Sequence, residues 1–286
     1  MQDREKQFIQ TLKRGNATYG VGDDGVVLGD YVIATDAFFE GIHFKREWGS
    51  LEILIEKCFL VNLSDIYAMN AIPKYLLLTL CVPKDIKDVK YLAKIFSAMA
   101  LKYGLKIIGG DTIVGEKLHF SLTLLGQKGK KGLYRCGIKP NDYLAYLNPK
   151  SILNHSKKQV FGKNVLHLKR ALLFGIYPKD SRFAMPLLYP KMILALNVIA
   201  RAGMDISDGI FIELSRLAKI NKIGFTFLLK KSNWFYSPEE YQMLYAFSPY
   251  KLSKAKRLAN QYRHQLVVFA RAKRGSYKLV KKNWHR

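Results

Sequence analysis

The chain has 286 residues, a length that allows one large domain or two domains of ordinary size. Hydrophobic residues make up 49% and charged residues 24%, so composition excludes extended disorder, collagen and coiled coil. Lys and Arg number 47 against 22 Asp and Glu, a net charge of +25. This excess is typical of proteins with polyanionic partners, such as nucleic acid, acidic membrane or nucleotides, but also of lysine-rich solvated surfaces.

The charge is unevenly distributed. Residues 1–142 hold 20 basic and 16 acidic side chains, whereas residues 143–286 hold 27 and 6. Seven of the 13 Asp residues lie in short motifs that contain Gly, Ser or Thr. This clustering of scarce acids is the main functional clue.

The first half of the chain predicts alternating helices and strands. In chain order we expect a helix at Arg4–Leu12, a loop at Gly20–Gly25, a hairpin in Val26–Ala34, a helix at Leu51–Met69, a strand at Tyr75–Val82, a helix at Val89–Tyr103, and strands at Leu105–Ile108 and Leu118–Leu125 flanking a turn at Gly109–Thr112. A basic loop follows at Lys128–Gly132, and a domain boundary is expected near residues 138–142.

The second half predicts a strand at Tyr143–Leu147 and then an irregular basic stretch to about Asp180. We expect a helix at Pro190–Ala200, a segment Met204–Asp208 that leads into a helix ending near Ile220, strands at Gly224–Leu229 and Leu266–Ala270, and helices between those strands. Because no clean βαβ rhythm appears, the pattern favours an α+β fold over a doubly wound sheet.

The sequence predicts a cytoplasmic protein with reduced, buried cysteines. Its apolar runs, such as Tyr75–Pro83, are shorter than the roughly 20 residues that span a bilayer, and the chain opens with charges. Cys58, Cys81 and Cys136 form no CxxC pair, which argues against a disulfide framework and a structural zinc site.

Familiar phosphate-binding motifs are absent from the sequence. Neither a P-loop nor a GxGxxG after a strand occurs, and HExxH and GxSxG are also missing. Instead, five segments each offer Asp in a loop, at a strand end or on a helix. They are Gly22-Asp23-Asp24-Gly25, Thr35-Asp36, Asn62-Leu63-Ser64-Asp65, Gly109-Gly110-Asp111-Thr112 and Asp205-Ile206-Ser207-Asp208-Gly209.

Each of these motifs alone also fits a turn, a helix cap or a solvated face, and His43 equally fits a satisfied, partly buried histidine. Together they form the pattern expected of a phosphate site with several cations, because Mg²⁺ takes carboxylate and phosphate oxygens.

The ordered series resembles the thiamine-monophosphate kinases, a family in the ATP-binding superfamily that includes aminoimidazole ribonucleotide synthetase. The similarity covers roughly residues 20–215. The matching stretches are the five Asp segments, Glu40-Gly41-Ile42-His43-Phe44, the continuation Ile66-Tyr67-Ala68-Met69-Asn70-Ala71-Ile72-Pro73, and Arg135.

The resemblance implies a homodimer of two-domain α+β subunits. Residues 1–138 would form an α/β domain with a mixed sheet, which binds ATP and Mg²⁺ and pairs with its copy across strands, and residues 139–286 an α/β sandwich domain. Positions that fall on Mg²⁺ ligands are Asp24, Thr35, Asp36, Asp65, Asp111, Asp205 and Asp208. Positions that fall on ATP contacts are Tyr103, Gly110, Asp111, Arg135 and Ser207, and those on thiamine-phosphate contacts are His43, Glu239 and Trp284.

The chain departs from the family pattern in its C-terminal half. A Gly-Gly-Glu/Asp-Asp-Tyr-Glu-Leu motif corresponds here to Ser237–Met243, which keeps an acid at Glu239 and loses the glycines. Asn148-Pro149-Lys150 replaces an expected Gly-rich turn, and Trp284 matches the terminal aromatic only loosely. The metal and ATP assignments are therefore firmer than the thiamine pocket.

The predicted function is Mg²⁺-assisted, in-line transfer of a phosphoryl group from ATP to thiamine monophosphate. The acceptor is itself a phosphate, largely anionic near neutral pH, so no catalytic general base is needed. One alternative is another ATP-using enzyme of the same superfamily with a different acceptor. The other is a basic nucleic-acid-binding protein, a model that gives the Asp series no role; neither nucleic acid nor membrane is therefore expected as a partner.

Overall fold

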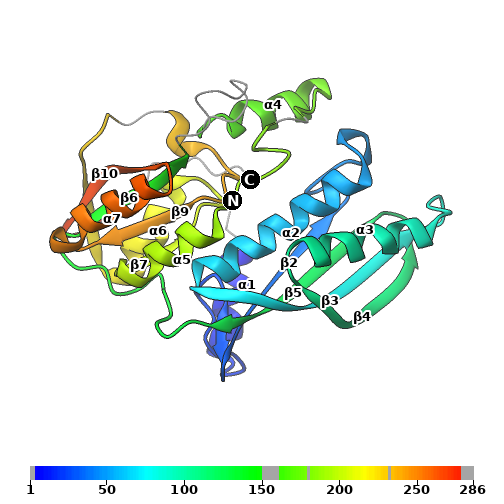
Figure 1. Ribbon diagram of the computed structural model, residues 1–286, viewed down its shortest axis with the longest axis horizontal. Helices are drawn as coiled ribbons and strands as arrows, with labels where there is room; N and C mark the ends of the chain where they lie inside the picture. The colour runs from blue at the N-terminus through cyan, green and yellow to red at the C-terminus, as the bar shows by residue number, and fades with distance from the viewer. Residues whose placement is uncertain (1–3, 150–160, 179–180, 231–232, 278–286) are drawn as a thin grey trace.

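Two five-stranded sheets and the helices packed on them make up the structure (Figure 1). This computed structural model describes residues 4–149, 161–178, 181–230 and 233–277. In these ranges no helix has the length and apolar character needed to cross a membrane.

The first sheet combines antiparallel strands with one parallel pair. Its strands are β1 (Val26–Leu28), β2 (Tyr31–Phe39), β3 (Ala71–Pro83), β4 (Lys106–Gly115) and β5 (His119–Lys128), in the order β1-β2-β5-β3-β4. Gly29 has a φ of +59° in the tight turn between β1 and β2, a conformation that favours glycine. Only β3 and β4 run parallel among these pairs, because α3 (Val89–Lys102) connects them as a crossover.

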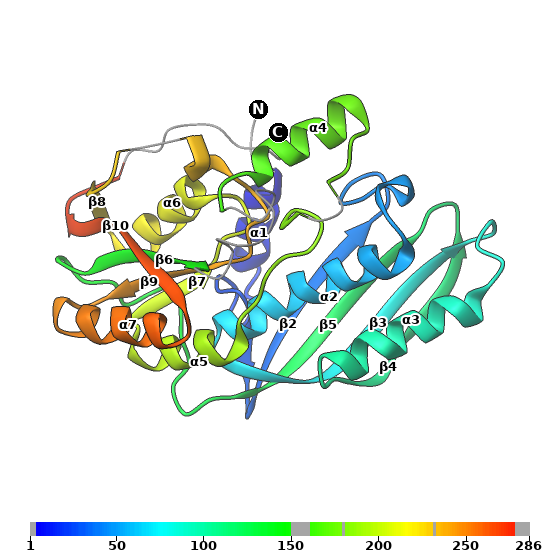
Figure 2. The ribbon, with the colours of Figure 1, turned by 45° about the horizontal axis from the view of Figure 1, so that its top comes forward.

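Helices α2 (Leu51–Ala68) and α3 cover one face of this sheet (Figure 2). α2 also contacts β7 and α5 of the second half, so it is packed from two sides. Its side chains are therefore buried over most of its circumference, and they include the polar Asn62 and Ser64. Since buried polar groups need partners, these two residues are candidates for specific contacts.

The second sheet is antiparallel and covered on both faces. It contains β6 (Tyr143–Pro149), β7 (Ala202–Asp205), β8 (Ile223–Phe227), β9 (Met243–Phe247) and β10 (His264–Arg274), in the order β7-β9-β6-β10-β8. Alternate residues of β9 enter different cores. Tyr245 packs with α5 (Pro190–Ile199) and α7 (Pro249–Gln261), and Leu244 packs with α6 (Ile210–Asn221). This arrangement is a sandwich of helices around a sheet, and the predicted α+β class is confirmed.

Four further helices complete the elements named here. They are α1 (Arg4–Arg14), α4 (Asn164–Phe174), and the 3-10 helices η1 (Arg46–Trp48) and η4 (Asn233–Tyr236).

Several local predictions are wrong. Gly109–Thr112 is no turn, because it lies inside β4 and pairs with β3. α4 lies within the stretch predicted to be irregular, where basic residues obscure its apolar spacing, and β9 was not predicted. The cysteines are free, yet Cys136 is exposed and Cys81 half-buried, so only Cys58 is buried as expected.

The aromatic centre beneath α2 and α3 offers a test of this packing. Phe120 is 1% exposed, and its ring centroid lies 5.6 Å from those of Phe38, Phe44 and Phe96. We expect Phe120→Ala to lower the free energy of unfolding by about 3–5 kcal/mol through the cavity it leaves. Urea unfolding measures the loss. Tyr250→Ala is the control, because Tyr250 is 94% exposed and its removal should change stability by less than about 0.5 kcal/mol.

Candidate functional site

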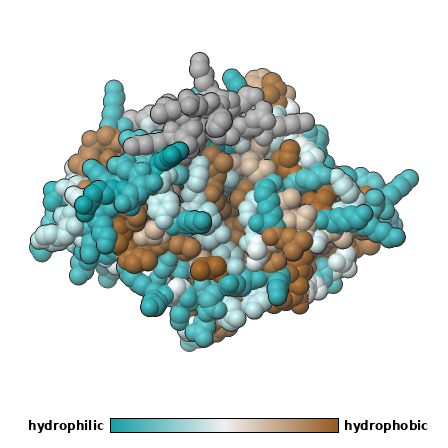
Figure 3. Space-filling view, in the orientation of Figure 1, coloured by the Kyte–Doolittle hydropathy of each residue, from teal (hydrophilic) through white to brown (hydrophobic). Residues whose placement is uncertain are grey.

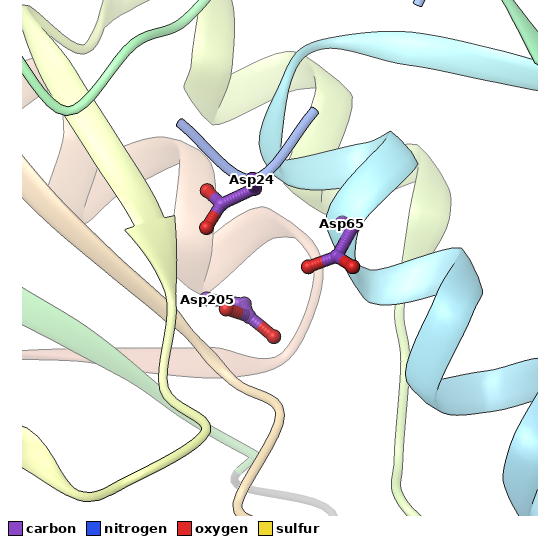
Figure 4. A group of neighbouring side chains, drawn as sticks. All are labelled: Asp24, Asp65 and Asp205. Atoms are coloured by element: carbon purple, nitrogen blue, oxygen red, sulfur yellow. The ribbon is translucent and has the colours of Figure 1, made fainter. Parts of the chain in front are cut away.

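Three aspartates from distant parts of the chain meet between the two sheets. Each of Asp24, Asp65 and Asp205 offers a carboxylate oxygen, and these atoms lie within 4.8 Å of one another. Figure 4 shows the three carboxyl groups converging from the loop before β1, from α2 and from the end of β7. We call these three residues the aspartate trio.

Neighbouring polar groups hold the trio in place. Ser64 Oγ donates to Asp205 Oδ2 at 2.7 Å, so α2 is bound directly to the end of β7. Two residues before Ser64, Asn62 donates to the carbonyl oxygen of Cys58 and accepts the backbone N–H of Asp36 at 3.1 Å. The buried polar residues of α2 thus fix the helix against both sheets.

Arg135 neutralises only part of the charge on Asp24. Its Nε lies 3.1 Å from Asp24 Oδ1, its NH2 also contacts that oxygen, and its backbone N–H donates to Asp23 Oδ1 at 2.6 Å. Oδ2 of Asp24 is buried and has no hydrogen-bond partner in the residues described, and the side chain is 1% exposed. An unpartnered, buried oxygen on one of three neighbouring carboxylates fits a divalent cation.

The electrostatics of the trio are unfavourable without a cation. Burial, together with the charge of Asp23 and Glu213, raises the pKa of Asp24 to about 6 against the lowering effect of Arg135. Burial and the charges of Asp36 and Asp205 raise the pKa of Asp65 well above its usual range. Burial and the charge of Asp24 do the same to the pKa of Asp205. Oxygen donors in this arrangement suit Mg²⁺, a hard cation.

Asp208 and Ser207 lie beside the trio but have other partners. Asp208 contacts Arg216, and its backbone N–H donates to Glu213 Oε1 at 3.0 Å. Ser207 Oγ lies 3.3 Å from the same oxygen of Glu213. Gly209 follows with a φ of +96°, and a Cβ there would lie only 3.0–3.2 Å from the backbone of residues 235–237. Glycine therefore lets this segment lie close to the end of η4.

Asp36 and Thr35 are neighbours in β2 whose side chains lie on opposite faces of the sheet. Asp36 faces α2, where burial raises its pKa and contacts with Asp65 and His43 oppose the shift. Thr35 is on the open face, and its Oγ1 is 2.9 Å from that of Thr123. His43 is exposed, stacks on Phe38, and its Nδ1 accepts the backbone N–H of Phe39. Of the two β2 residues, the structure brings Asp36 to the trio and leaves the Thr35 side chain outside it.

Three further predicted residues lie away from the trio. Asp111 and Gly110 are exposed on β4, three strands across the sheet from Asp36, which is about 14 Å. The register places Asp111 in line with Thr79, on the face opposite α2. Tyr103 ends α3, and its hydroxyl donates to Glu56 Oε1 at 2.6 Å.

Glu239, for which the resemblance implies a thiamine-phosphate contact, is paired with a buried lysine. Its carboxylate is 2.6 Å from Nζ of Lys57, whose side chain is 2% exposed, and its backbone N–H donates to the carbonyl of Ser207. Glu239 and Tyr241 have φ angles of +56° and +47°. The segment thus adopts left-handed conformations without the glycines of the family motif. Trp284 lies outside the described residues.

Sequence reasoning missed Lys57, Glu213, Arg216 and Tyr241. Lys57 was detectable as a charged residue two helical turns before Asp65, directly before the apolar run Cys58–Val61. Glu213 and Arg216 are three residues apart in α6, the spacing of a helical ion pair. Tyr241 had no such pattern; its relation to the site comes from the fold, as Glu239, Asp36, Asp205 and Asp65 all raise its pKa in addition to burial.

Comparison with known proteins gives matches that agree with this geometry. The family model "AIR synthase related protein, N-terminal domain" matches residues 22–127. Thiamine-monophosphate kinase of Buchnera aphidicola subsp. Schizaphis graminum is 32% identical over 226 residues, 74% of this chain and 66% of that protein. The B. subtilis enzyme is 33% identical, over 46% of this chain and 44% of its own length. The match thus spans less than two thirds of these two relatives.

A longer alignment supports the same family, and two solved structures share the fold. Thiamine-monophosphate kinase of Buchnera aphidicola subsp. Acyrthosiphon pisum is 30% identical over 241 residues, 79% of this chain and 71% of that protein. The crystal structure of thiamine monophosphate kinase from Aquifex aeolicus has a TM-score of 0.77 at 20% identity, covering 99% of this chain and all of that one. AaThiL complexed with AMPPCP and TMP has a TM-score of 0.78 at 22% identity, covering 99% and 98%. These last two similarities concern the fold.

The hydrogenase maturation protein HypE, in the HypE–HypF complex, also shares the fold, with a TM-score of 0.67 at 16% identity over 96% of this chain and 99% of that one. The relative from Buchnera aphidicola subsp. Acyrthosiphon pisum, at 30% identity over 71% of its length, and the ordered Asp segments favour the thiamine-monophosphate kinases over HypE. The chain belongs to the thiamine-monophosphate kinase family.

Proposed function

We propose that this protein transfers a phosphoryl group from ATP to thiamine monophosphate, giving thiamine diphosphate, with Mg²⁺ bound at the aspartate trio. The observation that carries the proposal is the meeting of three carboxylates from separate segments, two of them buried and that of Asp65 half-buried, and one with an unpartnered oxygen. Membership of the family supplies the two substrates. The cytoplasm, where ATP is available, is the location we propose.

The roles of the residues follow from charge. Asp24, Asp65 and Asp205 hold Mg²⁺ in this proposal, and Asp36 lies beside them on the same face of the sheet. Bound Mg²⁺ neutralises charge that spreads over the phosphoryl oxygens. Arg135, whose side chain is 18% exposed, directs a guanidinium toward the site and is placed to contact the ATP phosphates. The residues then need only to hold the γ-phosphate of ATP in line with the phosphate of thiamine monophosphate, and no side chain has to remove a proton.

The acceptor side is the part that differs most from the family. Lys57 holds Glu239 in place, so an acid is available for the organic portion of the acceptor although the glycines are missing. His43 lies at the other end of β2 from the hairpin, close enough to Asp36 to lower its pKa. Within the same superfamily, an ATP-using enzyme with another acceptor is the second candidate, and the altered Ser237–Met243 segment favours it.

We also propose a homodimer that pairs through the first sheet. β4 is an edge strand, and its apolar side chains are unusually exposed: Ile107 43%, Ile108 54%, Ile113 53% and Val114 70%. Figure 3 shows apolar side chains at the surface in the region of β3 and β4. An edge of this kind pairs readily with another strand. A dimer would enclose the exposed Asp111 and Gly110, which lie apart from the trio of their own protomer.

The activity test uses the purified chain, Mg²⁺, ATP and thiamine monophosphate. We expect thiamine diphosphate and ADP in equal amounts, product only when both substrates are present, and none in excess EDTA. Asp65→Asn should lower turnover at least about 100-fold, whereas Asp30→Asn, at an exposed turn, should leave it unchanged. ADP release that does not depend on thiamine monophosphate would point to another acceptor, and full activity of Asp65→Asn would contradict the site.

The pH dependence of stability tests the metal site without turnover. Because the pKa values of Asp24, Asp65 and Asp205 are raised in the folded state, folding binds protons, and stability is lost as pH rises through these values. In EDTA, we expect the melting temperature of wild type to fall relative to that of Asp65→Asn between pH 5 and 8. Added MgCl₂ should reverse the order of the two proteins. Parallel melting curves across this range would contradict buried, repelling carboxylates.

The dimer is tested by disrupting the β4 edge. Ile113→Lys places a charge on this exposed edge, and we expect a shift from dimer to monomer in analytical ultracentrifugation. Ile42→Lys is the matched control, since Ile42 is 73% exposed but lies in the turn after β2. A wild-type protein that sediments as a monomer at all concentrations would refute the proposed dimer.

A further inference from the structure

Arg216 is an intramolecular cation within the candidate site, and no motif pointed to it. It lies two turns into α6 and contacts two acids at once. Its NH1 is 2.9 and 2.7 Å from the two carboxylate oxygens of Glu213, and its NH2 contacts Oδ2 of Asp208. The Arg216 side chain is 34% exposed, while those of Asp208 and Glu213 are 13% and 0% exposed. The guanidinium therefore covers two carboxylates from the solvent side.

Glu213 has almost no capacity left for another ligand. Its Oε1 accepts from the backbone N–H of Asp208, from Ser207 Oγ and from Arg216, and its Oε2 accepts from Arg216. A carboxylate has roughly four acceptor positions, so this one is nearly saturated. A planar guanidinium that bridges two carboxylates is a strong and geometrically specific pair.

The aspartate trio presents the opposite situation. Asp24 Oδ1 is paired with Arg135, but Oδ2 of the same carboxylate is buried and unpartnered. Asp65 and Asp205 lie beside it, each with a carboxylate oxygen within 4.8 Å of the others. A divalent ion that prefers to keep most of its water and takes only one or two carboxylates gains more at the trio than at an Asp208 already bound to arginine.

We propose that Arg216 occupies the place of a metal ion at Asp208, so that this chain binds its cations at the aspartate trio and none at Asp208. The inference rests on the proposed function, and it changes the role expected for Asp208 from metal ligand to anchor of a guanidinium. Arg216 then supplies a fixed positive charge next to Ser207, where the family resemblance implies an ATP contact, and acts there as a positioning residue.

The test counts metal ions instead of turnovers. Mn²⁺, which is paramagnetic, is titrated into the nucleotide-free protein and the bound ions are counted by electron paramagnetic resonance. We expect wild type and Asp208→Asn to bind the same number, Asp65→Asn to bind fewer, and Arg216→Met to bind one more ion than wild type. Arg216→Lys keeps a cation and should match wild type.

Matched controls separate a local site from a general effect of charge. Lys219→Met removes one positive charge from the same helix at an exposed position, and it should leave the count unchanged. Where Arg216→Met does not fold, as circular dichroism would show, Asp208→Asn decides the question alone. Mn²⁺ should also raise the melting temperature of a folded Arg216→Met more than that of wild type.

The inference is overturned if Asp208→Asn binds one ion fewer than wild type, or if a folded Arg216→Met binds no additional ion. These results leave the proposed kinase intact when thiamine diphosphate is still formed. A wild type that binds no Mn²⁺ overturns the metal site of the proposed function and this inference together.

Discussion

The mutual repulsion of buried carboxylates is the constraint on which the rest of the site depends. Three carboxylate oxygens within 4.8 Å, away from solvent, are unfavourable unless cations or hydrogen-bond donors compensate them. The chain supplies Arg135, Arg216 and Ser64 for this purpose. Counting Asp36, Asp208 and Glu213 with the trio, six acids face two arginines. The remaining negative charge makes the centre a place for further cations, although the whole chain carries +25.

The contrast between a negative centre and a strongly basic chain is also seen in the positions of five acids of the second half. Residues 143–286 contain 27 basic and only 6 acidic side chains. Asp205, Asp208 and Glu213 are at the site, and Glu239 and Glu240 are in the segment that hydrogen-bonds to residues 206 and 207. These five acids are therefore more than surface groups. Asp208, Glu213 and Glu240 each pair with a guanidinium, Glu239 pairs with an ammonium, and Asp205 belongs to the aspartate trio.

Helix α2 relates this charge centre to the fold. Because it is packed against the first sheet on one side and against β7 and α5 on the other, its few polar residues have to find partners inside the protein. Asp65 joins the trio, Ser64 binds Asp205, and Lys57 binds Glu239 two helical turns away. One rigid element thus sets the spacing between the aspartate trio and Glu239, a spacing on which the proposed in-line transfer would depend.

Sequence alone predicted the elements and the acids but not the partners. The helices at Leu51–Met69 and Val89–Tyr103 and the hairpin near Gly29 follow from local periodicity, and the structure contains them. β9 and α4 were not identified: β9 is a run of five buried residues without alternation, and basic residues obscure the apolar spacing of α4. Six of the seven predicted metal ligands are Asp in short motifs of similar kind, yet Asp111 lies with Thr35 on the sheet face opposite α2 and Asp208 pairs with Arg216.

Strand alternation and the choice of counter-ion account for these differences, and neither can be read from a short motif. The face on which a strand residue lies follows from the register of its strand, and the register is determined by pairing with strands far along the chain. The counter-ion depends on which cation the fold brings within reach: Arg135 contacts one oxygen of Asp24 and leaves the other open, whereas Arg216 engages both oxygens of Glu213 and one of Asp208. Two carboxylates of the same chemistry can therefore differ in their capacity to bind a metal, because their neighbours differ. The order of the motifs identifies the family, but it does not determine which of the carboxylates has a free oxygen.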